Sequence, residues 1–351
     1  MYRAVRCANV TQAPREPRCA VPGPPRLESS AGLGIYTFDP LGGGVRHTAS
    51  QSGSRKPVRP VFGLGLCVVD ELLRVEDAGV RAERTRYLER AVCAGGMVAT
   101  ALVQAARLGC RAEILSVVGD DEEGRLVARA LRAAGVGTRR LLRSRRCPTS
   151  VAVVLVDARS GARRFLVPDR RAVERRAPRF DLAPIRKGSL LLVDGHYPAQ
   201  ALRAVRHARR VGAVVIGDFS DSRPAYHELL PYVDHAIVPA AFGESWRGLS
   251  PRDTLFALRE AYGGEPVVTE GRRGALTLVG DRPRRVPAQR VRVVDETGAG
   301  DVFHGAFAAG LAHGKPPFEA LQWASRAAAA CCTALGGQTR LMNLQEMRRA
   351  A

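Results

Sequence analysis

Three small residues and an acid stand directly before an apolar stretch in the segment VVDETGAGDVFHGAFAAGLAHG, residues 293–314. The apolar positions after Asp301 recur at helical spacing, which places Gly298, Ala299 and Gly300 in the turn at the N-terminus of a helix. With so few side-chain atoms in the way, the free backbone N–H groups and the positive end of the helix dipole can face an anion directly. A phosphoryl group in transfer is such an anion, because its oxygens need donors already in place. The segment therefore predicts an anion site.

Asp301 is expected at the edge of this site, where a carboxylate can accept the proton of an attacking hydroxyl group. The same residue could merely stabilise the N-terminus of the helix, an effect of about 1 kcal/mol. The residues of the motif alone leave both interpretations open.

Strand-like and helix-like segments alternate from Val61 onward and would have to position this motif. The strand-like runs include VFGLGLCVV, AEILSVVGDD, SLLLVDG, AVVIGD, HAIVP and PVVTEG. The segments MVATALVQAARLG, EEGRLVARALRAAGVG, PAQALRAVRHARRVG and PRDTLFALREAYGG have helical spacing. Strands that are apolar almost throughout indicate a mostly parallel sheet with helices on both faces. We therefore predict an α/β fold.

Two stretches interrupt this alternation. TSVAVVLVDARSGARRFLVP is predicted to form a hairpin, and LCVVDELLRVEDAGVRAERTRYLERAV contains further short strand-like pieces. We expect residues 68–93 and 149–168 to form a small antiparallel lid on a single domain spanning residues 59–345. Residues 1–58 are rich in Pro, Gly, Ser and Arg without a sustained period, which predicts a disordered tail or an over-called start of the reading frame.

The composition of the 351 residues narrows the class of protein. No uninterrupted apolar run is long enough for a membrane span, and no apolar stretch follows the basic start as in a secretory signal. The eight cysteines lack metal-site spacing and suit buried positions in a reducing compartment. The net charge of +20 comes from Arg spread along the chain, with only 5% aromatic residues, so no specific nucleic-acid partner is indicated. We expect a cytoplasmic protein.

The motif DETGAGDVFHGAFAAGL resembles the C-terminal signature of the ribokinase-like (PfkB) carbohydrate kinases. GLGLCVVDELLRVED is similar to the family's first strand with its substrate-binding Asp. AGGMVATALVQAARLG followed by VVGDDEEG is similar to the N-terminal Gly-Gly signature, and VVTEGRRGAL to the nucleotide-contacting strand and loop. The four motifs cover roughly residues 61–340 in the family's order. The resemblance implies a ribokinase-like fold with a small β-rich lid and an ATP-dependent sugar kinase.

The resemblance also implies roles for individual residues. Asp301 would be the catalytic base, and the backbone of Gly298, Ala299 and Gly300 would form the anion hole for the γ-phosphate. The implied sugar contacts are Asp70, Gly95 and Gly96, and the implied nucleotide contacts are Thr269, Gly271 and Gly274. Without the family, Asp70 would be a solvated acid at a strand end, and TEGRRGA would be a plain turn between strands.

Metal sites are implied less directly. Asp295 and Thr297, with CTALGG, resemble the monovalent-cation loop of many members, which implies K⁺. Members commonly carry Asn-x-x-Glu near Mg²⁺, whereas this chain has Ala240 and Ala241 there and leaves Glu244 as the candidate acid. Met97 replaces a polar residue that many members place after the Gly pair.

These departures point to the ketohexokinase-like and sulfofructose kinase-like branch, and so to a ketose or an acidic sugar such as a sulfosugar or phosphosugar. Arg86 is similar to a basic residue of the sulfosugar enzymes, and His196 follows the carboxyl end of a predicted strand, where open sheets bind ligands. Both are candidates for substrate contact. Arg163 and Arg164 on the hairpin suit an anionic ligand or a solvated surface, and His304 suits a packed helix face.

Other functions stay open from the residues. Members often pair through the lid strands, which implies a homodimer. A nucleoside kinase and a catalytically impaired ligand-binding regulator of the same fold are the alternatives. A polyanion-binding protein rests on net charge alone and predicts binding that weakens with salt and ignores ATP.

Overall fold

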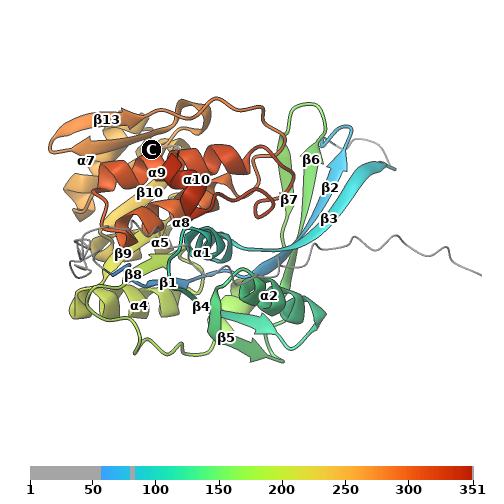
Figure 1. Ribbon diagram of the computed structural model, residues 1–351. Helices are drawn as coiled ribbons and strands as arrows, with labels where there is room; N and C mark the ends of the chain where they lie inside the picture. Colours follow the sequence, from blue (N-terminus) through green and yellow to red (C-terminus); the bar gives the residue numbers. More distant parts are fainter. Residues whose placement is uncertain (1–56, 80–83, 350–351) are drawn as a thin grey trace, which may run out of the picture. The chain divides into compact units, whose positions relative to one another are not determined.

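The computed structural model describes residues 57–79 and 84–349, all within one compact unit of residues 54–351 (Figure 1). The tail predicted for residues 1–58 falls outside the described residues except for Pro57 and Val58. Among the described residues, no helix is both long enough and apolar enough to cross a membrane.

Nine strands form the large sheet, in the spatial order β13-β12-β11-β10-β9-β8-β1-β4-β5. They are β1 (Val61–Leu64), β4 (Ala112–Gly119), β5 (Gly137–Ser144), β8 (Leu190–Val193), β9 (Val214–Asp218), β10 (His235–Pro239), β11 (Val267–Thr269), β12 (Ala275–Val279) and β13 (Arg282–Val286). All neighbours from β5 to β11 are parallel, and only β12 and β13 join antiparallel. The predicted mostly parallel sheet is therefore confirmed.

Helices cover both faces of this sheet (Figure 1). One hydrophobic cluster includes side chains of α1 (Met97–Arg107), α2 (Glu122–Ala133), α8 (Ala299–Ala312), α9 (Pro317–Cys331) and α10 (Leu344–Arg349). The other includes side chains of α4 (Pro198–Val211), α5 (Pro224–Leu229), α6 (Ala240–Arg247) and α7 (Pro251–Tyr262). Alternate residues of β8 divide between the two clusters, Leu190 and Leu192 in the first and Leu191 and Val193 in the second. Burial on both faces explains why the strands are apolar almost throughout.

Four strands form a second, smaller sheet in the order β3-β2-β6-β7. They are β2 (Val68–Val75), β3 (Tyr87–Gly95), β6 (Ser150–Asp157) and β7 (Arg163–Leu166), and the short helix α3 (Arg171–Arg176) follows. The outer pairs are antiparallel as expected, but the central strands β2 and β6 run parallel. The lid is therefore a mixed sheet, because β2 and β6 come from separate parts of the chain and are not joined by a hairpin.

The segment VFGLGLCVV was expected to be one strand, but the structure divides it between the two sheets. The break falls after Leu64, where a Cβ on Gly65 would collide with the Asp194 carboxylate. The Leu66 N–H donates to Asp194 Oδ2 at 2.7 Å, so the chain leaves the large sheet at this point. This crossing places the start of the small sheet beside the carboxyl ends of the large-sheet strands.

Close packing of two helices fixes the position of α8. A Cβ on Gly305 would collide with the Ala101 carbonyl of α1, so glycine is required for this approach. This contact holds α8 against α1.

Candidate active site

A cavity of about 1060 Å³ is lined by residues of both sheets and of α8. The large sheet contributes the carboxyl ends of three strands, represented by Asp218 of β9, Pro239 of β10 and Thr269 of β11. The small sheet contributes Asp70 of β2, and α8 contributes Asp301. Open α/β sheets bind ligands at the carboxyl ends of their parallel strands, so this cavity is the candidate active site.

The N-terminal end of α8 faces the cavity with little side-chain bulk. Gly298 has a φ of 74°, and a Cβ there would lie 2.6 Å from Gly337 Cα, so the fold itself requires glycine. A Cβ on Gly300 would meet no atom of the chain within 4 Å, although Gly300 lines the cavity. The first N–H groups of a helix have no acceptor within the helix. The packing thus explains Gly298, whereas at Gly300 it leaves room for a ligand to approach the backbone.

Asp301 has an unusual protonation equilibrium. Burial raises the pKa of Asp301 to about 7, and the nearby Asp218 carboxylate acts in the same direction. Asp218 is itself buried, and burial together with Asp194 raises its pKa well above the usual range. A carboxylate with a pKa near neutrality can both take up and release a proton at physiological pH, which suits a general base.

Asp70 reaches the same cavity from the small sheet. A Cβ on Gly95 would collide with the Asp70 carboxylate, and a Cβ on Gly96 would collide with the Leu66 carbonyl. Gly96 also has a φ of 104°, which favours glycine. Burial raises the pKa of Asp70 to about 6. Asp70 and Gly96 line the cavity, whereas Gly95 serves to make room for the Asp70 side chain.

The loop after β11 forms another part of the cavity wall. Thr269, Gly271 and Gly274 all line it, which brings the three predicted nucleotide contacts together. Between them, the Glu270 side chain is buried and pairs with Arg273 at 3.0 Å and with Arg285 at 2.5 Å. These ion pairs hold the loop in place and leave its glycines open to the cavity.

Comparison with known proteins decides the family. Residues 64–343 match the model of the pfkB family of carbohydrate kinases. The chain belongs to this family. PfkB kinases are phosphotransferases with an alcohol acceptor, so the protein is a carbohydrate kinase with the expected ribokinase-like fold.

Several relatives of this kinase are ribokinases by name. Ribokinase of Bacillus subtilis is 27% identical over 286 residues, which cover 80% of this chain and 95% of the relative. A deoxyribokinase of Salmonella typhi is 29% identical over 61% of this chain and 73% of its own length. The solved structure of a protein from Agrobacterium tumefaciens, provisionally described as a ribokinase, has a TM-score of 0.78 and 28% identity and covers 83% of this chain and 97% of that one. The ketohexokinase-like and sulfofructose kinase-like branch stays a prediction.

Besides Gly95 and the fully buried Asp295, three further predicted site residues of the kinase do not line the cavity. His196 turns its ring toward Glu174, with 2.8 Å between Nδ1 and Oε1. Arg86 is exposed just before β3, and Glu244 is exposed on α6. Direct contact of these three side chains with a substrate or metal in the cavity is therefore not supported by the geometry.

The predicted cation loop is a tightly bonded structure in this kinase. The fully buried Asp295 carboxylate accepts hydrogen bonds from the Thr297 N–H at 2.8 Å, the Thr297 hydroxyl at 2.6 Å and the Gly336 N–H at 2.8 Å. These bonds join the segment before α8 to the segment after α9. In the described ranges, no group of three or more His, Cys, Asp or Glu side chains is arranged to hold a metal ion.

Two buried carboxylates at strand ends were missed from the sequence. Asp194 follows β8 and accepts hydrogen bonds from the Leu66 and His196 N–H groups. Asp218 ends β9, lines the cavity and lies 3.3 Å from His304 Nδ1. His304, expected on a packed helix face, also lines the cavity. Each acid ends a short apolar strand, and that position was the signal that could have identified them.

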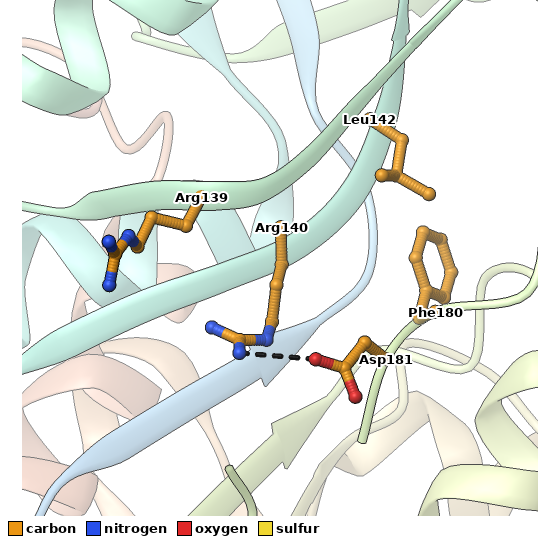
Figure 2. Close-up of a pocket in the computed structure, with 5 residues that line it drawn as sticks. All are labelled: Arg139, Arg140, Leu142, Phe180 and Asp181. Carbon is orange, nitrogen blue, oxygen red and sulfur yellow. Dashed lines mark hydrogen bonds and ion pairs between the residues drawn. The ribbon is translucent and has the colours of Figure 1, made fainter. Parts of the chain in front are cut away.

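A second, smaller hollow of about 240 Å³ shares no lining residue with the cavity. It is lined by Arg139, Arg140, Leu142, Phe180 and Asp181 (Figure 2). Arg140 pairs with Asp181 at 3.2 Å and with Glu113 at 2.5 Å, so its charge is already balanced. These ion pairs beside the edge strand β5 hold Arg140 in place, so we assign the hollow a structural role.

Proposed function

We propose that the protein transfers the γ-phosphate of Mg·ATP to a hydroxyl group of a sugar bound between Asp70 and Asp301. The observation that carries this proposal is the raised pKa of Asp301, to about 7, directly after a turn whose Gly300 is open to the cavity. A base in this position can accept the hydroxyl proton while the N–H groups of the turn hold the transferring phosphoryl group.

In the proposed reaction, the sugar oxygen forms a bond to the γ-phosphorus, the bond to the bridging oxygen of ADP breaks, and the proton passes to Asp301. Asp70 accepts hydrogen bonds from sugar hydroxyls, and Gly96 lets the sugar approach the backbone. Mg²⁺ enters as part of the nucleotide substrate and neutralises charge on the phosphates. The loop of Thr269, Gly271 and Gly274 contacts the nucleotide, and the Asp295–Thr297 loop is the candidate for K⁺. The small sheet covers the sugar and excludes water.

The sugar itself remains a prediction. The sequence favours a ketose or an acidic sugar, whereas curated relatives are named ribokinase and deoxyribokinase. Ribose and deoxyribose therefore belong in any substrate test beside the ketoses. The cytoplasm remains the expected compartment.

ADP release measured across ribose, deoxyribose, ketoses, sugar phosphates, a sulfosugar and nucleosides tests the proposal. We expect one sugar to give turnover that Asp301→Asn lowers by about 10² or more, while Asp281→Asn, at a fully exposed carboxylate, leaves it unchanged. Turnover with nucleosides only would favour the nucleoside kinase. Ligand-induced thermal stabilisation without turnover would favour the ligand-binding regulator.

We also propose a homodimer through the outer face of the small sheet. Leu88, Val92, Val151 and Leu166 are exposed there, with exposed fractions of 52%, 42%, 36% and 52%. Strand alternation places this apolar face opposite the one that carries Asp70. Light scattering should show a dimer that Val92→Glu converts to a monomer. A wild type that is monomeric at micromolar concentration would contradict the proposal.

A further inference from the structure

Two adjacent arginines on β7 face opposite sides of the small sheet. Arg163 pairs with Val156 of β6 and lies on the same face as Phe165, two residues further on, and both line the cavity. Arg164 is exposed and does not line it. The position of the small sheet thus decides which of the two arginines faces the candidate active site, and that residue is Arg163.

The guanidinium group of Arg163 lies beside the turn that begins α8. Its Nη2 is 3.8 Å from Glu296 Oε2, and the Glu296 carbonyl accepts a hydrogen bond from the Ala299 N–H at 3.2 Å. The turn between β6 and β7 approaches the same segment, because a Cβ on Gly161 would lie 3.7 Å from the Val294 carbonyl oxygen. Residues 298–300, which we call the anion turn, are therefore linked to Arg163 through its ion pair with Glu296.

The ion pair between Arg163 and Glu296 is weak enough for the guanidinium group to leave it and bind a phosphate. The Glu296 side chain is 59% exposed and that of Arg163 27% exposed, at a separation near the upper limit for an ion pair. Such pairs contribute about 0–1 kcal/mol. Phosphate oxygens, which bear more charge and accept two N–H groups at once, would compete well for the guanidinium group.

Arg163 differs in this respect from the other arginines of the cavity wall. In the part of the chain that the structure describes, Arg170, Arg272 and Arg290 also line the cavity, but only Arg163 forms an ion pair with a residue next to the anion turn. The second acid of the DETGAGD motif, Glu296, therefore lies beside Arg163.

We propose that Arg163 is a further catalytic residue, which the lid brings to the γ-phosphoryl group during transfer. This inference rests on the proposed kinase function. The guanidinium group would donate two N–H bonds to the equatorial oxygens while the bond from the sugar oxygen forms and the bond to ADP breaks. Arg163 exchanges no proton, because the hydroxyl proton passes to Asp301. Charge stabilisation of this kind by arginine raises turnover by about 10³–10⁵ in other phosphoryl-transfer enzymes.

The test compares Arg163→Ala and Arg163→Lys with Arg164→Ala, the matched control on the opposite face of the same strand. We expect Arg163→Ala to lower kcat by about 10² or more with little change in the KM of the sugar. Arg163→Lys should retain part of the activity, and Arg164→Ala nearly all of it. Guanidinium chloride at millimolar concentration should partly restore Arg163→Ala but not Asp301→Asn. A merely structural role would not give this selective rescue.

Several outcomes would overturn the inference. They are full kcat in Arg163→Ala, a loss confined to the KM of the sugar, and equal losses in Arg163→Ala and Arg164→Ala. If Arg163→Ala does not fold, Arg163→Lys and Arg163→Gln carry the same comparison. An active wild type with an inactive Asp301→Asn and a fully active Arg163→Ala would leave the kinase function standing and remove only this inference. A wild type without sugar-dependent turnover would remove both.

Discussion

The charged carboxylate of Asp301 lowers the free energy of unfolding, and the Asp301→Asn substitution should remove this effect. Burial raises the pKa of this carboxyl from 3.8 to about 7. A group with a higher pKa in the folded state binds its proton more tightly there. The contribution of Asp301 to the free energy of unfolding is therefore fully present below about pH 4 and is lost as the pH rises to about 7. A shift of this size corresponds to about 4 kcal/mol in the free energy of unfolding at pH 8. The amide of Asn has almost the same shape and no charge to desolvate.

Denaturant unfolding of both proteins at three pH values measures this difference. We expect Asp301→Asn to be more stable than the wild type by about 2–4 kcal/mol near pH 8, by about 1–2 kcal/mol near pH 5, and by almost nothing near pH 4. The control is Asp281→Asn, which removes a carboxylate whose side chain is 99% exposed and should change stability by less than about 0.5 kcal/mol.

Equal or lower stability of Asp301→Asn near pH 8 would refute the reasoning, because it would mean that the fold does not penalise the charged carboxylate. Equal differences at all three pH values would also refute it, since they would indicate a packing effect. If Asp301→Asn is more stable than the wild type and has lost its turnover, the protein retains the unfavourable charged carboxylate of Asp301 for catalysis.

Three further predictions follow from the same geometry. The pH profile of kcat/KM should have an acid limb near pH 7, because Asp301 must lose its proton to act as a base and its pKa is raised to about 7; a limb near pH 4 would contradict this assignment. Gly300→Ala should fold normally but lose turnover about tenfold or more, since its Cβ would enter the cavity, whereas Gly298→Ala should lower the melting temperature because of its φ of 74° and the nearby Gly337; thermal melts and ADP release distinguish the two. Asp295→Ala should destabilise the protein by about 2–4 kcal/mol through three lost hydrogen bonds to a buried carboxylate, measured by urea unfolding.

The local features of this protein were determined by the sequence alone. Apolar runs, helical spacing and glycine punctuation predicted most strands and helices, because these depend on residues close together in the chain. The Gly-Ala-Gly turn before Asp301 was found in the same way. The small residues there predicted a helix N-terminus that a ligand could reach. In the structure, Gly300 lines the cavity, and a Cβ there would meet no atom within 4 Å.

The tertiary structure decided what depends on contacts through space. The pKa of Asp301 depends on burial and on Asp218, a residue on a distant strand that no local pattern connects to it. Strand alternation could separate Arg163 from Arg164, but only the position of the small sheet settled which of them faces the cavity. His196 follows the carboxyl end of a parallel strand, as predicted. Its partner Glu174 lies on α3, and no pattern in the sequence predicted that this helix packs beside His196. Burial and charge interactions act between neighbours in space, and the fold alone determines which residues those are.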